Sequence, residues 1–262
     1  MIDYGLVSII TPSYDSSRYI AQTIETIQAQ TYKNWELLIT DDCSSDKTFN
    51  IIKEFADKDK RIRVFRLNEN LGPGTARNHS IREAKGRFIA FCDSDDRWTP
   101  DKLERQLKFM VEGNYNLTYT SYTTCGEDGI IKGYVKCLPK IDKFSIIRDN
   151  GIGCLTAIFN AEKIGKHYMP TLRKRQDWCL WIDIISKTGP AFGLQEPLAI
   201  YRMLEGSVSR NKMSLIKYNY DVYHIHLKHN KATSTLMLFG LFMPYYIYKK
   251  IKQKFETHRN LR

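Results

Sequence analysis

The strongest constraint on the fold is the alternation of short strand-like runs with helix-like stretches in the first 91 residues. The runs LVSII, WELLIT, RIRVFRL and RFIAF are rich in β-branched and aromatic residues. Between the first two, Ile20, Ile24 and Ile27 repeat at the spacing of one helix face. Strands buried on both faces have this continuous apolar character, and strands that alternate with helices form parallel sheets. The sequence therefore predicts an α/β fold in which helices cover a parallel sheet.

The rest of the chain adds further elements and shows no clear domain boundary before residue 212. The segment WTPDKLERQLKFMVEG predicts a helix with Thr99 as its N-cap and Pro100 at its first position. NLTYTSYTT alternates like a half-buried strand, and DWCLWIDIIS has the pattern of a helix. We therefore expect one domain over residues 1–211 and a helical C-terminal extension over residues 212–262.

The C-terminal extension contains an apolar and aromatic run, Thr235–Phe255, which is interrupted by Pro244 and contains several lysines. This run falls short of the roughly 20 apolar residues that a membrane span needs. One interpretation is a helix in the membrane interface, with its tyrosines at headgroup depth and its lysines on anionic lipid. The other is a helix packed on the domain or on a second subunit of a homodimer. Both interpretations are compatible with the sequence.

Composition restricts the ligand and the compartment without identifying either. The formal charge of +11 indicates attraction to anions, which include nucleic acid, nucleotides, anionic lipid and phosphorylated substrates. The six cysteines have no CxxC spacing and no paired histidines, which favours reduced thiols in a cytosolic protein over a zinc site or a disulfide framework. The N-terminal segment has no basic leader and only a short apolar run, which argues against a signal peptide.

Two acidic clusters directly follow predicted strands. Asp41 and Asp42 follow WELLIT, and Asp93, Asp95 and Asp96 follow RFIAFC. In open α/β sheets the loops at the carboxyl ends of the strands converge on one crevice, where ligands bind. Carboxylates there could share a divalent cation that also binds substrate phosphates. The alternative is that these aspartates cap helices or lie in a solvated turn.

The segment LGPGTARN partly matches a dinucleotide-binding fingerprint. It begins as G-x-G, but Arg77 stands at the position of the third glycine, and the segment follows a later strand than the fingerprint requires. We therefore interpret Arg77 as a cation close to phosphates or to the aspartates. Gly72 and Gly74 would allow the backbone to approach closely.

Five segments occur in the order and spacing of a known family: VSIITPSYD, QTYKNWELLITDDCSSDKT, NLGPGTARN, GRFIAFCDSDDRWTPDKLERQ and RKRQDWCLW. Over residues 5–210 the chain resembles the family 2 inverting glycosyltransferases, which use nucleotide sugars and have the GT-A fold. It is most similar to bacterial enzymes that build capsule, O-antigen or teichuronic-type polysaccharides. The resemblance implies a Rossmann-like, mixed and mainly parallel sheet flanked by helices.

The resemblance also implies roles for residues that match the family motifs. The catalytic base would be Asp177, although Gln176 replaces the acid that the family more often has before the base. The metal ion, Mn²⁺ or Mg²⁺, would bind Asp95, with Asp96 as an alternative. The donor nucleotide would be bound by a larger set: Thr11, Pro12, Tyr14, Asp42, Arg77, Asp93 and Ser94. A loop that closes over the diphosphate would contain Tyr201, Arg202 and Ser207.

Two carboxylate sites far apart in the sequence suit the two separate tasks of an inverting transfer. One carboxylate removes the proton of the acceptor hydroxyl that attacks the anomeric carbon. A metal ion stabilises the charge that develops on the leaving diphosphate. The expected activity is therefore metal-dependent transfer from a UDP-sugar to a lipid-linked or polysaccharide acceptor, at the inner face of the bacterial cell membrane.

Two other classes of function were compared with this one. A nucleotidyltransferase is disfavoured because no glycine- and lysine-rich loop follows the first strand, and a dinucleotide-dependent oxidoreductase is disfavoured by the failed fingerprint. A basic nucleic-acid-binding protein is compatible with the charge. However, the basic residues are dispersed, and the acidic clusters would repel phosphate in the absence of a metal. We therefore expect no nucleic-acid partner.

Overall fold

The computed structural model describes residues 2–204 and 212–260, with side chains described for 2–204 and 216–252. Ten strands form one sheet over the described residues: β1 Val7–Ser13, β2 Trp35–Asp41, β3 Ile62–Arg66, β4 Phe88–Phe91, β5 Arg97–Trp98, β6 Leu117–Cys125, β7 Ile131–Val135, β8 Lys140–Ile141, β9 Ile158–Asn160 and β10 Ala191–Arg202.

The described α-helices are α1 Ile20–Gln28, α2 Thr48–Lys58, α3 Pro73–Glu83, α4 Lys102–Glu112, α5 Lys143–Arg148, α6 Ala161–Ile164, α7 Gln176–Thr188, α8 Lys212–Asp221, α9 Lys231–Met237 and α10 Met243–Asn260. A 3₁₀ turn, η1, covers Cys154–Thr156, and two π-helical turns, η2 (Val222–His226) and η3 (Leu238–Phe242), connect the C-terminal helices.

The sheet is mixed, as the sequence predicts. Its strand order is β3-β2-β1-β4-β9-β6-β10-β5, with β7 paired to β6 and β8 paired to β10. The N-terminal strands β3, β2, β1 and β4 are all parallel, and β6 is parallel to β10. β9 lies antiparallel between β4 and β6 and joins the two parallel parts. The carboxyl ends of β1, β2 and β4 therefore lie side by side at one edge of the sheet.

The N-terminal strands are buried because helices cover them. Every residue of β1 and β2 is buried, which explains why these strands are apolar without alternation. Ile20, Ile24 and Ile27 of α1 are fully buried in the same apolar cluster as Ile9 of β1. The predicted helix face is therefore confirmed.

The start of α4 differs from the sequence prediction. The helix begins at Lys102 with Asp101 as its N-cap residue, so the prediction that Thr99 caps it is wrong. The hydroxyl of Thr99 instead donates to Oδ1 of Asp101 at 2.8 Å, and the amide of Thr99 donates to the carbonyl of Leu198 at 3.0 Å. Pairing with β10 therefore keeps Thr99 outside the helix, which is a tertiary contact that local sequence does not show.

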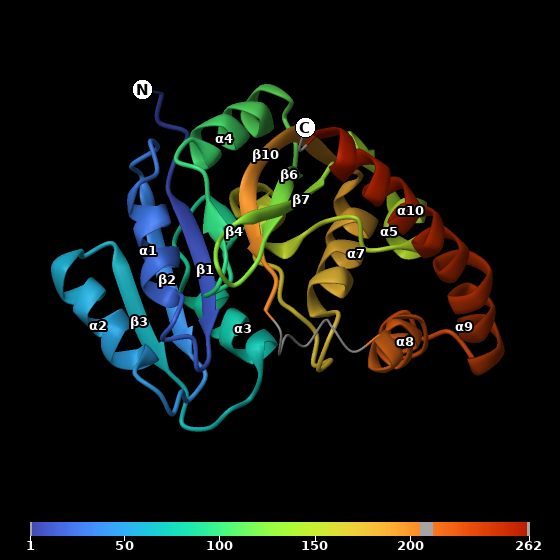
Figure 1. Cartoon of the computed structure of the whole chain (residues 1–262), viewed down its shortest axis with the longest axis horizontal. Helices are drawn as coiled ribbons and strands as arrows, with labels where there is room; N and C mark the ends of the chain where they lie inside the picture. Colours follow the sequence, from blue (N-terminus) through green and yellow to red (C-terminus); the bar gives the residue numbers. More distant parts are fainter. Residues whose placement is uncertain (1, 205–211, 261–262) are drawn as a thin grey trace.

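The C-terminal extension is helical and packs on the rest of the molecule, where α10 lies beside α5 and α7 (Figure 1). Tyr223 and Phe242 are buried, with their ring centroids 5.9 and 5.7 Å from that of Trp178 in α7. The expected boundary after residue 211 lies outside the described residues. Within the described part of the chain, no helix has the length and apolar character needed to span a membrane.

Candidate active site

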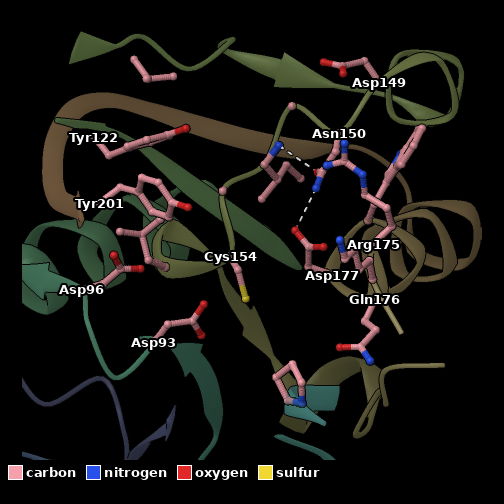
Figure 2. Close-up of a pocket in the computed structure, with 18 of the residues that line it drawn as sticks. Asp93, Asp96, Tyr122, Asp149, Asn150, Cys154, Arg175, Gln176, Asp177 and Tyr201 are labelled. Carbon is pink, nitrogen blue, oxygen red and sulfur yellow. Dashed lines mark hydrogen bonds between the residues drawn. The ribbon is translucent and has the colours of Figure 1, made fainter. Parts of the chain in front are cut away.

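A cleft of about 1750 Å³ opens at the carboxyl ends of β1, β2 and β4 and extends to α7 and α10. Figure 2 shows Asp93 and Asp96 on one wall of this cleft and Asp177 with Asn150 across from them. Most of the site residues expected from the sequence line it: Pro12, Tyr14, Asp42, Arg77, Asp93, Ser94, Asp95, Asp96, Asp177 and Tyr201. The structure therefore brings together residues that are up to 189 positions apart in the sequence.

Asp42 is buried and holds the loop that precedes α3. Its Oδ1 and Oδ2 accept hydrogen bonds from the backbone amides of Leu71 and Gly72, each at 2.8 Å. Gly72 has a φ of 88°, a conformation that side chains with a Cβ rarely adopt, and Pro73 then begins the helix. The carboxylate of Asp42 therefore fixes the NLGPG segment at the edge of the cleft.

Arg77 is a buried cation that forms an ion pair with the acidic turn after β4. Its NH2 lies 2.6 Å from Oδ1 of Asp93, and its side chain is only 10% exposed. Burial by itself would lower the pKa of Arg77, but the interactions with Asp93 and, more weakly, Asp177 raise it above its ordinary value. The guanidinium thus stays charged between the strand-end aspartates and Asp177.

The turn after β4 carries carboxylates in an unfavourable environment. Burial, followed by repulsion from Asp93, raises the pKa of Asp95 to about 6. Burial, followed by repulsion from Asp95, raises the pKa of Asp96 well above its usual range. Arg202 supports this turn, because its amide donates to Oδ1 of Asp96 and its Nε to the carbonyl of Asp95, each at 3.0 Å.

The carboxylates of this turn fit a divalent cation that shares its ligands with a substrate. Within residues 2–204 and 216–252, no group of three or more His, Cys, Asp or Glu side chains is arranged to hold a metal alone. Mg²⁺, however, is commonly held by one or two carboxylates together with substrate phosphates, and Mn²⁺ accepts the same oxygen ligands. Asp95, which lines the cleft close to Asp93, has the ligand chemistry and the excess negative charge for such an ion.

Asp177 lies in the first turn of α7, where a negative charge is favoured by the helix dipole. Its Oδ2 accepts a hydrogen bond from Nδ2 of Asn150 at 2.8 Å (Figure 2). Gln176 does not take the place of a second acid, because its Nε2 donates to the carbonyl of Leu172 and its side chain packs against Gly74 at the start of α3. Among the residues of its motif, Asp177 is therefore the carboxylate that faces the cleft.

Two of the expected site residues are described but do not line the cleft, and a third is not described. Thr11 is fully buried in β1 beneath the cleft. Arg202 is 3% exposed, and its guanidinium contacts the carbonyls of Asp95 and Glu127, so it shapes the acidic turn from behind. Ser207 lies outside the described residues, so its expected role in a diphosphate loop stays a prediction.

Several cleft residues were missed by sequence analysis. Asn150 and Asp149 follow the short helix α5, and Lys249 comes from α10, where its Nζ contacts Oδ2 of Asp149 and lies 3.3 Å from the carbonyl of Asn150. None of these residues belongs to a motif, and only the packing of α10 beside α5 brings them to Asp177. The lysine-rich end of the apolar run was the single signal that pointed to this part of the chain.

A Rossmann-like sheet with an acidic turn at its carboxyl edge and a separate carboxylate across the cleft is the arrangement of a GT-A glycosyltransferase. The chain belongs to the family described as Glycosyl transferase family 2, which matches residues 8–161. It is therefore a glycosyltransferase, and the expected class of enzyme is confirmed.

Relatives with known assignments cover most of the chain. The chain is 39% identical over 219 residues to the glycosyltransferase TuaG of Bacillus subtilis (strain 168), assigned to teichuronic acid biosynthesis, covering 83% of this chain and 87% of TuaG. It is 37% identical over 223 residues to WfgD of Escherichia coli, a UDP-Glc:alpha-D-GlcNAc-diphosphoundecaprenol beta-1,3-glucosyltransferase, covering 85% and 86% of the two chains.

Solved structures confirm the fold. S. aureus TarS residues 1–349, in complex with UDP-GlcNAc, matches with a TM-score of 0.70 at 22% identity, over 88% of this chain and 70% of TarS. The mannosyltransferase PcManGT of Pyrobaculum calidifontis, in complex with GDP-Man and Mn²⁺, matches with a TM-score of 0.61 at 17% identity, over 87% and 65% of the two chains. At these identities the likeness shows the GT-A fold alone.

Proposed function

We propose that this protein is an inverting glycosyltransferase that moves a sugar from a UDP-sugar to a lipid-linked or saccharide acceptor in bacterial surface glycan synthesis. One observation carries the proposal: a single cleft contains the acidic turn after β4 on one wall and Asp177 on the other, with the buried Arg77 guanidinium 2.6 Å from Asp93. The relatives support the nucleotide and the pathway class, since WfgD is named for a UDP-glucose donor and TuaG for teichuronic acid biosynthesis.

In this reaction an acceptor hydroxyl forms a bond to the anomeric carbon as the bond from that carbon to the diphosphate oxygen breaks. Asp177 takes the hydroxyl proton as the general base. The hydrogen bond from Asn150 orients its carboxylate. Attack from the face opposite the leaving group requires base and diphosphate on different sides of the sugar, which fits the separation of Asp177 from the β4 turn across the cleft (Figure 2).

The donor nucleotide would occupy the wall formed by the ends of β1, β2 and β4. Pro12, Tyr14 and Asp42 would frame the base and ribose, and Thr11 would support them from the strand below. Arg77, Asp93 and Ser94 would lie beside the diphosphate. Tyr201 and Ser207 would contribute to a loop over it, with Arg202 acting through the acidic turn that it supports.

The metal ion would bind at Asp95, with Asp93 or Asp96 adjacent, and Mn²⁺ and Mg²⁺ both suit these oxygen ligands. When bound, it would supply a positive charge that stabilises the departing diphosphate. The raised pKa of Asp95 supports this assignment, because a cation would relieve the repulsion and desolvation that disfavour the ionised carboxylate.

The C-terminal helices that supply part of the cleft lining also expose a surface suited to anionic lipid at the inner face of the cell membrane. Leu236, Phe239, Ile247 and Ile251 are each more than half exposed and recur at helical spacing along α9 to α10; we call them the apolar stripe. Tyr248, Lys250 and Lys252 line the adjacent cleft. Apolar side chains flanked by lysines favour an anionic lipid surface. A homodimer contact is the competing use of the same residues.

The test of the proposed function is the substitution Asp177→Asn. We expect transfer from a panel of UDP-sugars to fall roughly 10²- to 10⁴-fold, since a general base contributes that much. Thermal stabilisation by UDP with Mn²⁺ should stay at the wild-type value in this variant and be lost in Asp95→Asn.

The matched control is Asp183→Asn, on the same helix α7 but outside the cleft, where Asp183 pairs with His226 at 3.0 Å. Its transfer rate should stay close to that of the wild type. Wild-type transfer by Asp177→Asn would exclude Asp177 as the base, and stabilisation of the protein by NAD instead of UDP would exclude the proposed donor.

A further inference from the structure

The charges that line the cleft are strongly segregated. Among the described lining residues numbered below 100, five are acidic and two are basic; among those numbered above 130, eight are basic and two are acidic. The acidic part coincides with the proposed donor and metal site. The basic part surrounds Asp177 and has no role in the transfer chemistry described so far.

Five of these basic residues line the same cleft as Asp177 and come from three separate segments. Arg148 ends α5, Lys249 comes from α10, and Arg173, Lys174 and Arg175 directly precede α7; we call this set the basic arc. Lys249 lies 3.3 Å from the carbonyl of Asn150, whose side chain donates to Asp177. The basic arc therefore begins within one residue of the group that would receive the acceptor's proton.

Arg148 is held in place by aromatic packing that leaves part of its hydrogen-bonding capacity unused. Its guanidinium carbon lies 3.6 Å from the ring centroid of Tyr245 in α10. Its buried Nε has no hydrogen-bond partner among the described atoms. A planar guanidinium fixed by a ring and lining a cleft is well suited to bind a phosphate oxygen.

We infer that the basic arc binds a phosphate or diphosphate attached to the acceptor sugar, so that the acceptor is an anionic sugar phosphate and not a neutral polysaccharide end. This inference rests on the proposed function, because it uses Asp177 to locate the accepting hydroxyl. A phosphate on the same sugar lies one ring away from that hydroxyl, which is the spacing at which cations beside Asp177 would contact it. The apolar stripe is exposed on the C-terminal helices that also supply Lys249, and it would accommodate a lipid attached to that phosphate.

The test measures binding of farnesyl diphosphate in EDTA, which removes the divalent cation that the proposed donor site would use to bind a diphosphate. Wild-type protein should bind farnesyl diphosphate more tightly than farnesol. Arg173→Gln, at an exposed side chain, and Arg148→Gln should each weaken binding roughly tenfold, the effect of losing one charged hydrogen-bond partner. Lys143→Gln is the matched control, since Lys143 is exposed on the same helix as Arg148 and does not line the cleft.

Each outcome has a separate meaning. Equal binding by wild type and both arginine variants, or displacement of farnesyl diphosphate by UDP, would overturn the inference. Vesicles of phosphatidylglycerol form a second arm: if the arginine variants lose vesicle binding but keep farnesyl diphosphate, the basic arc binds lipid headgroups and the inference fails. Stabilisation of the wild type by UDP with Mn²⁺ is measured in parallel. If UDP with Mn²⁺ stabilises the wild type but farnesyl diphosphate does not bind, only the acceptor inference fails. If UDP with Mn²⁺ does not stabilise the wild type, the proposed function fails.

Discussion

Asn150 acts on Asp177 from a position that is itself fixed by the C-terminal helix. Its Nδ2 donates to Oδ2 of Asp177 at 2.8 Å, and its carbonyl lies 3.3 Å from Nζ of Lys249. A hydrogen bond to a carboxylate fixes the orientation of the carboxylate. We therefore expect Asn150 to act as a positioning residue for the proposed base.

We expect Asn150→Ala to lower kcat roughly tenfold or more, because hydrogen bonds to charged groups contribute on the order of 1.5–3 kcal/mol. The KM for the UDP-sugar should be unchanged. Steady-state kinetics with varied donor would separate the two parameters. Asn116→Ala is the control, since Asn116 donates to the carbonyl of Thr188 away from the cleft. A rise in KM equal to the fall in kcat would contradict a positioning role.

At the scale of elements, α4 is held on the sheet partly by a buried lysine. Lys102 is fully buried, its Nζ donates to Oε1 of Gln106 at 2.7 Å, and it lies 4.2 Å from the ring centroid of Trp98. Burial lowers the pKa of Lys102 to about 7. Because an unfolded chain would keep this lysine protonated up to its ordinary pKa, the unfolded state binds more protons than the folded state from about pH 7 to about pH 10.

The free energy of unfolding should therefore rise with pH across this window. Between pH 7 and 10 the free energy of unfolding of the wild type should rise, relative to that of Lys102→Met, by up to about 1.4 kcal/mol per pH unit. The reason is that the variant lacks the titrating group. Urea unfolding at several pH values measures the difference. Lys108→Met, on the same helix with an exposed side chain, should follow the wild-type slope. Parallel profiles for the wild type and Lys102→Met would show that Lys102 is charged in the folded protein.

At the scale of the whole molecule, the C-terminal extension has two different faces. One face buries Tyr223, Leu238 and Phe242 in the apolar cluster that includes Trp178, so this face is part of the enzyme core. The other face exposes the apolar stripe, on the helices that also supply the cleft-lining residues Tyr248, Lys250 and Lys252. A helix that is fixed to the core and exposes apolar side chains next to an active-site cleft would present that cleft to a lipid surface.

We expect the protein to bind phosphatidylglycerol vesicles, and the double substitution Leu236→Ser with Ile247→Ser to weaken this binding by roughly tenfold or more. The reason is that burying each such side chain contributes on the order of 1.5 kcal/mol or more. Vesicle sedimentation measures the effect, and Ile130→Ser, at an exposed apolar residue elsewhere, is the control. If the substitutions instead dissociate a dimer in analytical ultracentrifugation and leave vesicle binding unchanged, the apolar stripe is a subunit contact.

The sequence by itself determined the parallel N-terminal sheet, the helical extension and the acidic turn after β4. These features depend on local patterns: apolar runs define β1, β2 and β4, and the aspartates follow those strands directly. The motif around Asp177 could also be recognised from the sequence, because its residues are contiguous in the chain. Only the tertiary structure decided that Thr99 is held outside α4 and that Arg202 supports the acidic turn from behind. It also decided that Asn150 donates to Asp177, that Lys249 lies beside Asn150, and that Arg148 packs on Tyr245. Such contacts join residues about 30 to 110 positions apart through packing of whole elements, and no local pattern encodes them.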